Sequence, residues 1–164
     1  MSVGVTMNEL LIWQDESARS WKAHLEANPE LLDVPCSIGG AGTVQGFVRH
    51  IWSAELRWVE RLAELPLTPR EEIPTGPVSA LYELHERAAA GFRELLAAPE
   101  ESWNGTLVMD VPWLPEEART ISRRKALAHA LFHSQRHWAQ LATLAREAGF
   151  PAKSAGDLLF SSAL

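Results

Sequence analysis

Histidines are the side chains of this sequence best suited to chemistry. There are six of them: His24, His50, His85, His129, His133 and His137. Successive residues turn by about 100° on a helix, so the angle of each histidine from the apolar stripe of its helix can be estimated. His137 lies about 40° from the centre of its stripe and His133 about 80°, so both face inward as an i,i+4 pair. His50 lies about 80° from the centre of its own stripe, at an edge from which it can meet this pair.

Such an arrangement of imidazoles suits a metal ion. Two histidines four residues apart lie one helical turn apart, at a separation that a single ion can bridge. Imidazole is the commonest protein ligand for Zn, Ni, Cu and Fe(II). Three protein ligands leave coordination positions open, which is typical of a reactive rather than a structural site. One interpretation of this arrangement is a divalent ion held by His50, His133 and His137, where it would activate water or a thiol or polarise a substrate oxygen.

The His-x-x-x-His spacing is weakly specific by itself, because two histidines occur at this distance by chance on many helices. Its alternative interpretation is a pair of hydrogen-bonded histidines at the edge of a core, without a metal. The residue after His133 is Ser134 rather than glutamate. A metalloprotease of the His-Glu-x-x-His type is therefore excluded, because its general base is missing.

Four stretches of helical periodicity would position these histidines. We expect helices from Met7 to about Asn28, from an N-cap at Thr43 to about Leu65, from about Val78 to Ala98, and from about Ser122 to about Ala148. The long connector over residues 99–120 contains an Asn104-Gly105 turn signal and is expected to form a short hairpin or an ordered lid. The apolar tail over residues 157–160 is expected to dock on the body. The pattern predicts an all-α four-helix bundle, as a single domain over residues 1–164.

Composition excludes several classes of function. The net charge is −6, and no basic stripe is present to neutralise phosphates, so binding of nucleic acid or anionic membranes is disfavoured. The basic run at residues 123–125 is interpreted as a solvated helix end. A single cysteine, Cys36, cannot form an intramolecular disulfide and suits a reducing compartment. No signal peptide or membrane span is apparent, so we expect a cytoplasmic protein.

Two segments carry a resemblance to a known family. The first segment reads Val48-Arg49-His50-Ile51-Trp52-Ser53-Ala54-Glu55-Leu56-Arg57-Trp58. The second reads His129-Ala130-Leu131-Phe132-His133-Ser134-Gln135-Arg136-His137-Trp138-Ala139-Gln140-Leu141. Both resemble the DinB/YfiT-like superfamily, which is described as metal-dependent enzymes. That family has one histidine early in its second helix and a His-x-x-x-His-x-x-Gln run in its last helix. The closing segments over residues 146–151 and 157–160 are also similar to its usual ending, so the resemblance covers nearly the whole chain.

The resemblance places the family's metal ligands on His50, His133 and His137. It places the family's glutamine on Gln140, where the side chain could orient the His137 imidazole. His129 matches a position that is often histidine without being a ligand. The resemblance also implies a four-helix bundle, frequently a homodimer, that binds Zn or Ni. Characterised members include thiol transferases that join a low-molecular-weight thiol to an electrophile and a mycothiol-dependent isomerase, whereas others are known only as hydrolases or damage-inducible proteins.

The remaining polar candidates receive plainer interpretations. His24 and His85 are expected at the surface or at an edge. Cys36 is expected to be an ordinary thiol, because no neighbouring His or Lys in the sequence lowers its pKa. Glu55 is either a general base near the metal or part of a charged surface. Three tryptophans flank the histidines and either line a substrate pocket or pack in the core: Trp52, Trp58 and Trp138.

Three functions remain open on these grounds. The first is a metal-dependent transferase or hydrolase that presents an ionised thiol or water to a small molecule. The second is a metal- or ligand-binding protein without catalysis, and the third is a structural bundle with buried histidines. A metal site open to a pocket would favour the first, a closed site the second, and histidines bonded to carbonyls or carboxylates the third.

Overall fold

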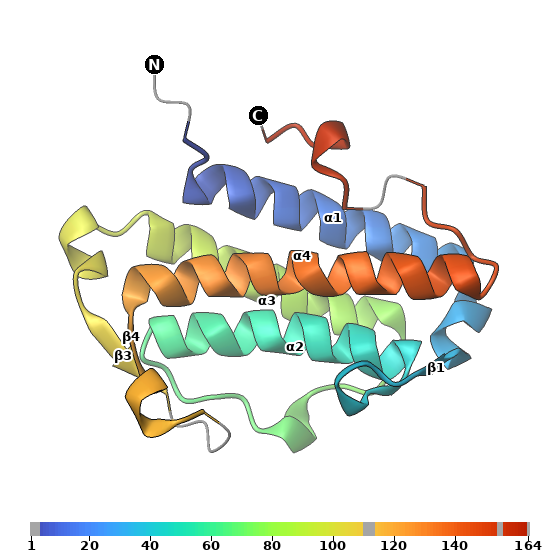
Figure 1. Ribbon diagram of the computed structural model, residues 1–164, viewed down its shortest axis with the longest axis horizontal. Helices are drawn as coiled ribbons and strands as arrows, with labels where there is room; N and C mark the ends of the chain where they lie inside the picture. The colour runs from blue at the N-terminus through green and yellow to red at the C-terminus, as the bar shows by residue number, and fades with distance from the viewer. Residues whose placement is uncertain (1–3, 110–113, 154–155, 164) are drawn as a thin grey trace.

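The four expected helices form an all-α bundle. The computed structural model describes residues 4–109, 114–153 and 156–163. Its long helices are α1 (Met7–Ala27), α2 (Val44–Leu62), α3 (Val78–Leu96) and α4 (Arg123–Glu147), and they lie side by side along the long axis of the molecule (Figure 1). α2 packs against α3 and α4, and α1 packs against the same two helices. The predicted fold class is thus confirmed.

Side-chain caps set the starts of three helices. The Thr6 hydroxyl accepts a hydrogen bond from the Glu9 amide, and the Glu9 carboxylate accepts one from the Thr6 amide in return. Thr43 caps α2, as predicted, and Ser122 caps α4. α2 ends at Leu62, before the predicted Leu65, because the chain turns through the positive φ of 58° at Glu64.

Tryptophans occupy the centre of the bundle. Trp21, Trp52 and Trp138 are all fully buried. The Trp21 ring stacks on Trp138 at 5.6 Å between centroids, and Trp52 meets Trp138 edge-on at 5.7 Å. Trp52 and Trp138 therefore belong to the core, in agreement with the plainer of their two interpretations, while Trp58 is only half-buried.

The connector before α4 contains the expected hairpin. Strand β3 (Thr106–Val108) pairs antiparallel with β4 (Thr120–Ser122), and Thr106 lies opposite Ser122. The Asn104-Gly105 pair precedes β3 and does not form the turn between the strands. Residues 110–113 of the connector between the two strands lie outside the described residues.

A second small ladder lies before α2. Strand β1 (Pro35–Cys36) pairs antiparallel with β2 (Gly42–Thr43). Between them the chain reverses through Gly39 and Gly40, whose φ angles of 59° and 73° favour glycine. Cys36 is a free thiol, 3% exposed in the core, which fits an ordinary structural cysteine.

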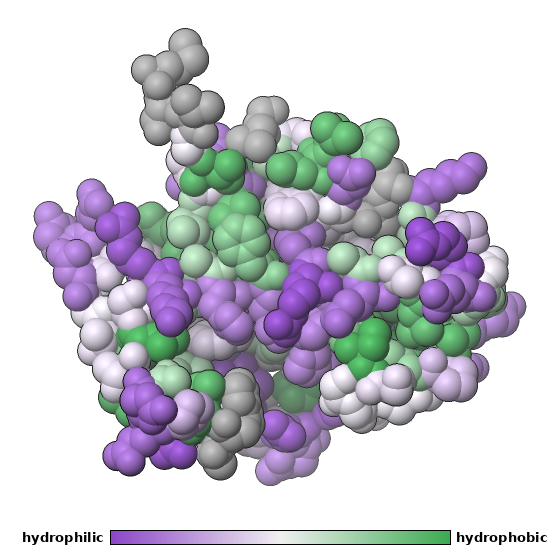
Figure 2. Space-filling model, viewed as in Figure 1, coloured by the Kyte–Doolittle hydropathy of each residue, from purple (hydrophilic) through white to green (hydrophobic). Residues whose placement is uncertain are grey.

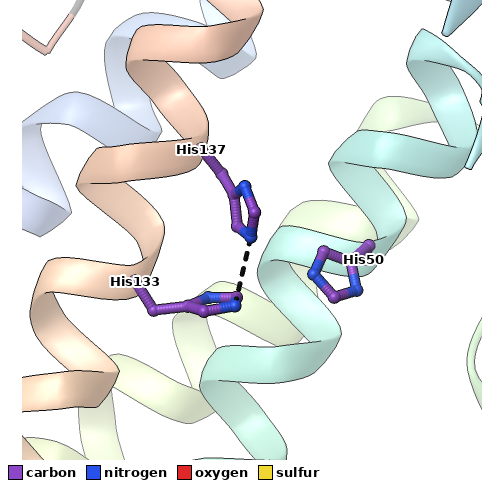
Figure 3. Close-up of side chains that lie close together, drawn as sticks. All are labelled: His50, His133 and His137. Carbon is purple, nitrogen blue, oxygen red and sulfur yellow. Dashed lines mark hydrogen bonds between the residues drawn. The ribbon is translucent and has the colours of Figure 1, made fainter. Parts of the chain in front are cut away.

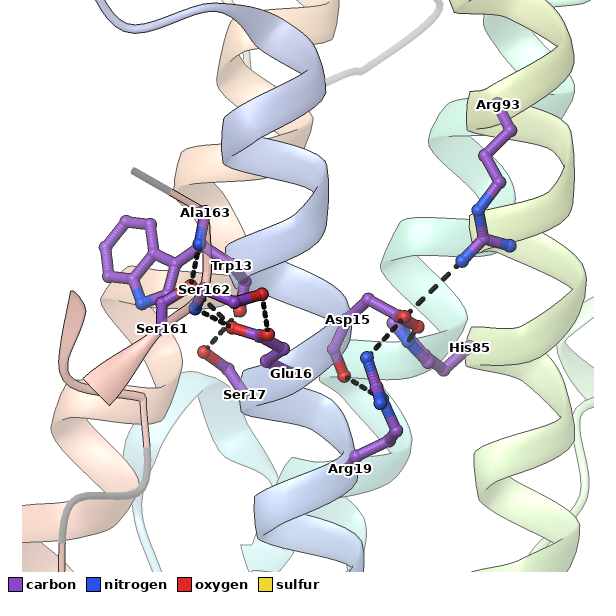
Figure 4. Close-up of polar contacts among 10 residues, drawn as sticks. All are labelled: Trp13, Asp15, Glu16, Ser17, Arg19, His85, Arg93, Ser161, Ser162 and Ala163. Carbon is purple, nitrogen blue, oxygen red and sulfur yellow. Dashed lines mark hydrogen bonds and ion pairs between the residues drawn. The ribbon is translucent and has the colours of Figure 1, made fainter. Parts of the chain in front are cut away.

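One buried polar cluster joins three helices. His85 on α3 is 1% exposed, so the prediction of a surface or edge position is wrong. Its Nδ1 lies 2.7 Å from Glu55 Oε2 on α2, and its Nε2 lies 3.1 Å from Asp15 Oδ1 on α1. Arg19 and Arg93 also contact the Asp15 carboxylate (Figure 4). Partners on two other helices allow this histidine to be buried.

The C-terminal segment lies along α1, but its docking is polar rather than apolar. The hydroxyls of Ser161 and Ser162 donate to the Glu16 carboxylate at 2.5 and 2.6 Å (Figure 4). Leu159 and Phe160 are 88% and 71% exposed, so the expected apolar contact is wrong. Figure 2 accordingly shows hydrophobic side chains at the surface over α1 and this segment. Across the described ranges, no helix has the length and apolar character required to span a membrane.

Candidate metal centre

Three histidines from two neighbouring helices meet on one face of the bundle. His50 comes from the second turn of α2, and His133 and His137 come from successive turns of α4 (Figure 3). One nitrogen from each ring can be chosen so that all three lie within 4.8 Å of one another. The ring centroids are 5.5 Å apart for His50 and His133, 5.1 Å for His50 and His137, and 4.3 Å for His133 and His137. The structure thus brings together the three side chains that the sequence singled out.

The donor set fits a small divalent ion. The Nε2 atoms of His133 and His137 are 3.1 Å apart. Two nitrogens that share a tetrahedral Zn at about 2.0–2.1 Å each are separated by about 3.3 Å, so this pair needs almost no rearrangement. Among the described residues, none of the three imidazoles is hydrogen-bonded to a carboxylate or a backbone carbonyl. His133 and His137 are instead hydrogen-bonded to each other, and His137 also contacts Gln140 and Arg136.

Gln140 selects the nitrogen that His137 offers. The Gln140 Oε1 atom lies 2.7 Å from His137 Nδ1, and an amide oxygen can only accept a hydrogen bond. The proton of neutral His137 is therefore on Nδ1, and the lone pair is on Nε2, which faces His133. The family resemblance predicted that Gln140 orients the His137 imidazole. The structure confirms that Gln140 lies one turn along α4 from His137 and contacts its ring.

Burial keeps these histidines in the form that binds metal ions. It is the main cause that lowers the pKa of His133 to about 3, and the neighbouring His137 and His50 lower it further. Burial also lowers the pKa values of His50 and His137. All three imidazoles are consequently neutral at pH 7, with lone pairs available for coordination.

A hollow opens beside His133. Its volume is about 370 Å³, and it is lined by His129, Phe132, His133, Gln135 and Arg136. These side chains follow one stripe of α4, where Figure 2 shows hydrophilic residues at the surface over the middle of the helix. His129 is exposed and its ring packs 5.0 Å from Trp58, outside the three-histidine group as predicted.

Some residues near the site were missed or misplaced by sequence reasoning. Glu55 is 1% exposed and bonded to His85, so it belongs neither to the histidine group nor to a charged surface. The pocket is walled by Phe132 and not by Trp52, which is fully buried. Arg136 was not considered, although its Nη2 lies 3.4 Å from His137 Nε2. Its position three residues after His133 is the signal that could have revealed it.

Comparison with known proteins identifies the family of the chain. The sequence pattern of the DinB family matches residues 1–161, essentially the whole chain. The chain belongs to the DinB family. No curated protein matches this DinB protein.

Proposed function

We propose that this DinB protein is a metal-dependent enzyme acting on a small molecule, with His50, His133 and His137 as the ligands of one Zn or Ni ion. The proposal rests mainly on three neutral imidazoles whose nitrogens lie within 4.8 Å of one another. Membership of the DinB family supports it. The adjacent hollow favours an enzyme over a closed, non-catalytic metal site, since a substrate needs access to the ion.

The chemistry follows from the ligand set. A divalent ion held by three neutral histidines supplies Lewis acidity, which lowers the pKa of a thiol or of water or polarises a substrate oxygen. Gln140 fixes the orientation of the His137 ring, whose Nε2 lies 3.1 Å from His133 Nε2. A transferase would use this acidity on a low-molecular-weight thiol, and a hydrolase would use it on water. The family resemblance favours the thiol, and it also favours a homodimer.

Metal content tests the first half of the proposal. Untagged protein, purified without chelator, would be analysed by inductively coupled plasma mass spectrometry beside a His133→Ala/His137→Ala variant. We expect about one divalent ion per chain in the parent and none in the variant. A His24→Ala/His129→Ala variant removes two histidines outside the group and should keep the ion. No ion in the parent, even after soaking in Zn or Ni, would contradict the proposal.

Catalysis needs a second measurement. Metal-loaded protein would be incubated with a low-molecular-weight thiol and an electrophile, and loss of free thiol would be followed over time. Turnover that stops on chelation and returns with Zn or Ni is the expected result. A loaded protein without turnover toward thiols and hydrolysable esters would instead support a binding protein.

A further inference from the structure

The charges around the three histidines have a single sign, although the chain as a whole is acidic. The protein has 21 Asp and Glu residues against 15 Lys and Arg residues. In the described part of the chain, no carboxylate is hydrogen-bonded or ion-paired to His50, His133 or His137. Within the described residues, the three histidines therefore have no carboxylate partner that would balance the charge of a bound cation.

Arg136 is the cation nearest to the site. Its guanidinium Nη2 lies 3.4 Å from His137 Nε2, the atom whose lone pair Gln140 leaves free. No ion pair joins Arg136 to a carboxylate among the described residues. Arg146 on the same helix also has no ion pair, but Arg136 is the arginine that contacts a histidine of the group. An arginine without an acidic partner beside a metal-binding nitrogen is suited to an anionic ligand.

Two further cations reinforce this field. Arg70 and Arg136 both lie close enough to His50 for their positive charges to act on its ring. Arg70 is kept near α2 because Arg49 donates hydrogen bonds to the carbonyl of Arg70 and to two neighbouring carbonyls. Lys125, near the start of α4, adds its positive charge close to His129. Glu71 and Glu72 follow Arg70 in the sequence, but neither is ion-paired to it.

The hollow also has an apolar wall. Phe132 is 54% exposed and lines the space between His133 and Arg136 on the same stripe of α4. An exposed phenyl ring in a fixed position beside a cation can cover the hydrocarbon part of a ligand whose charged end reaches the guanidinium. Phe132 and Arg136 lie one helical turn apart, a spacing of about 5–6 Å that a short carbon chain can span.

We propose that the substrate of this site carries a carboxylate, which pairs with Arg136, and a short apolar segment, which lies on Phe132. This assignment rests on the proposed function and gives the substrate class for the same site. Arg136 binds and orients the substrate through its two parallel N–H donors, while the reacting group lies toward the three histidines. A divalent ion held by His137 Nε2 would replace the hydrogen bond from Arg136 to that nitrogen, so the guanidinium would be available to the carboxylate.

Two thiols that differ mainly in charge provide the test. Zinc-loaded protein would be titrated by isothermal calorimetry at low ionic strength with 3-mercaptopropionate, which has a carboxylate, and with 2-mercaptoethanol, which has none. We expect 3-mercaptopropionate to bind about tenfold more tightly or better. In Arg136→Gln this preference should disappear, and Arg136→Lys should retain part of it. Zinc content would be measured for every variant.

Arg124→Gln is the matched control, because Arg124 lies on the same helix, is 66% exposed and faces Glu100 rather than the histidines. It removes the same charge and should keep the preference. A zinc-loaded parent that binds both thiols equally, or an Arg136→Gln variant that keeps the preference, would overturn this inference while the metal site stands. A parent that takes up no zinc would overturn the proposed function and this inference together.

Discussion

Gln140 decides which nitrogen of His137 is available to an ion. Its side-chain oxygen holds the proton on Nδ1 at 2.7 Å and so directs the lone pair of Nε2 toward His133. A residue that accepts this hydrogen bond also restricts rotation of the imidazole, which reduces the entropy lost when an ion binds. The side chain of Gln140 itself is exposed and covers no core surface.

Replacement of Gln140 should therefore affect the metal and not the fold. We expect Gln140→Ala to lower zinc affinity about 10- to 100-fold, measured by competition with a chromophoric chelator. Gln140→Glu keeps an acceptor at this position and should retain most of the affinity. Equal affinities in the parent and in Gln140→Ala would show that the hydrogen bond does not position His137.

Single residues also show where sequence reasoning succeeded and where it failed. The angle of a side chain around a helix follows from its number alone, so the inward positions of His133 and His137 could be predicted from neighbours on the same helix. His85 could not be placed in this way, since the partners that permit its burial, Asp15 and Glu55, lie on other helices. Arg136 was missed for a similar reason, because its importance comes from the absence of an acidic partner in space.

At the level of elements, α2 and α3 approach each other closely at Gly91. A Cβ atom built on Gly91 of α3 would lie 2.4 Å from Val59 Cγ1 of α2, far inside van der Waals contact. Gly in the middle of a helix normally costs about 1 kcal/mol relative to alanine, so a replacement would usually stabilise the helix. The contact with the buried Val59 reverses that expectation.

We expect Gly91→Ala to destabilise the protein by about 1–3 kcal/mol, because the two helices must separate or Val59 must leave its rotamer. Urea unfolding followed by circular dichroism measures this change. In the Val59→Ala background the same replacement should be neutral or stabilising, since the clash is gone. A stabilising effect of Gly91→Ala alone would mean that the helices are not packed as closely as described.

The elements themselves were predictable to different degrees. The four helices follow from apolar periodicity and from caps such as Thr43 and Ser122, which act locally. The end of α2 was placed too late, because a left-handed turn at Glu64 has no glycine to mark it. The pairing of β3 with β4 joins residues on either side of a long connector, so the sequence could indicate a hairpin but not its register.

For the whole molecule, the cluster around His85 makes stability depend on pH. Burial alone would lower the pKa of His85, but the negative charge of Glu55 and the hydrogen bonds with Asp15 and Glu55 outweigh it and raise the pKa to about 9. Because folding raises the pKa of His85, protonation of this histidine stabilises the folded protein. The stabilisation is fully present below the pKa of the unfolded state, about 6.5. That stabilisation is lost as the pH rises through about 9.

The free energy of unfolding should therefore fall between pH 6.5 and 9 by up to about 3 kcal/mol, as measured by urea titrations of metal-free protein at several pH values. His85→Gln keeps polar atoms at this position but has no charge to lose. Its stability should be lower overall and nearly constant over the same interval. Parallel pH curves for the two proteins would mean that His85 is not protonated in the folded state.

The three histidines belong to helices that are separated along the chain by all of α3 and the β3–β4 hairpin (Figure 1). An unfolded chain seldom brings such distant side chains together, so an ion that needs all three binds almost exclusively to the folded form. By thermodynamic linkage, free metal at a hundredfold excess over its dissociation constant adds about 2.7 kcal/mol to the stability of the fold. Net stabilities of proteins are only about 5–15 kcal/mol. The supply of metal in a cell would then regulate how much of this protein persists as well as how much of it is active.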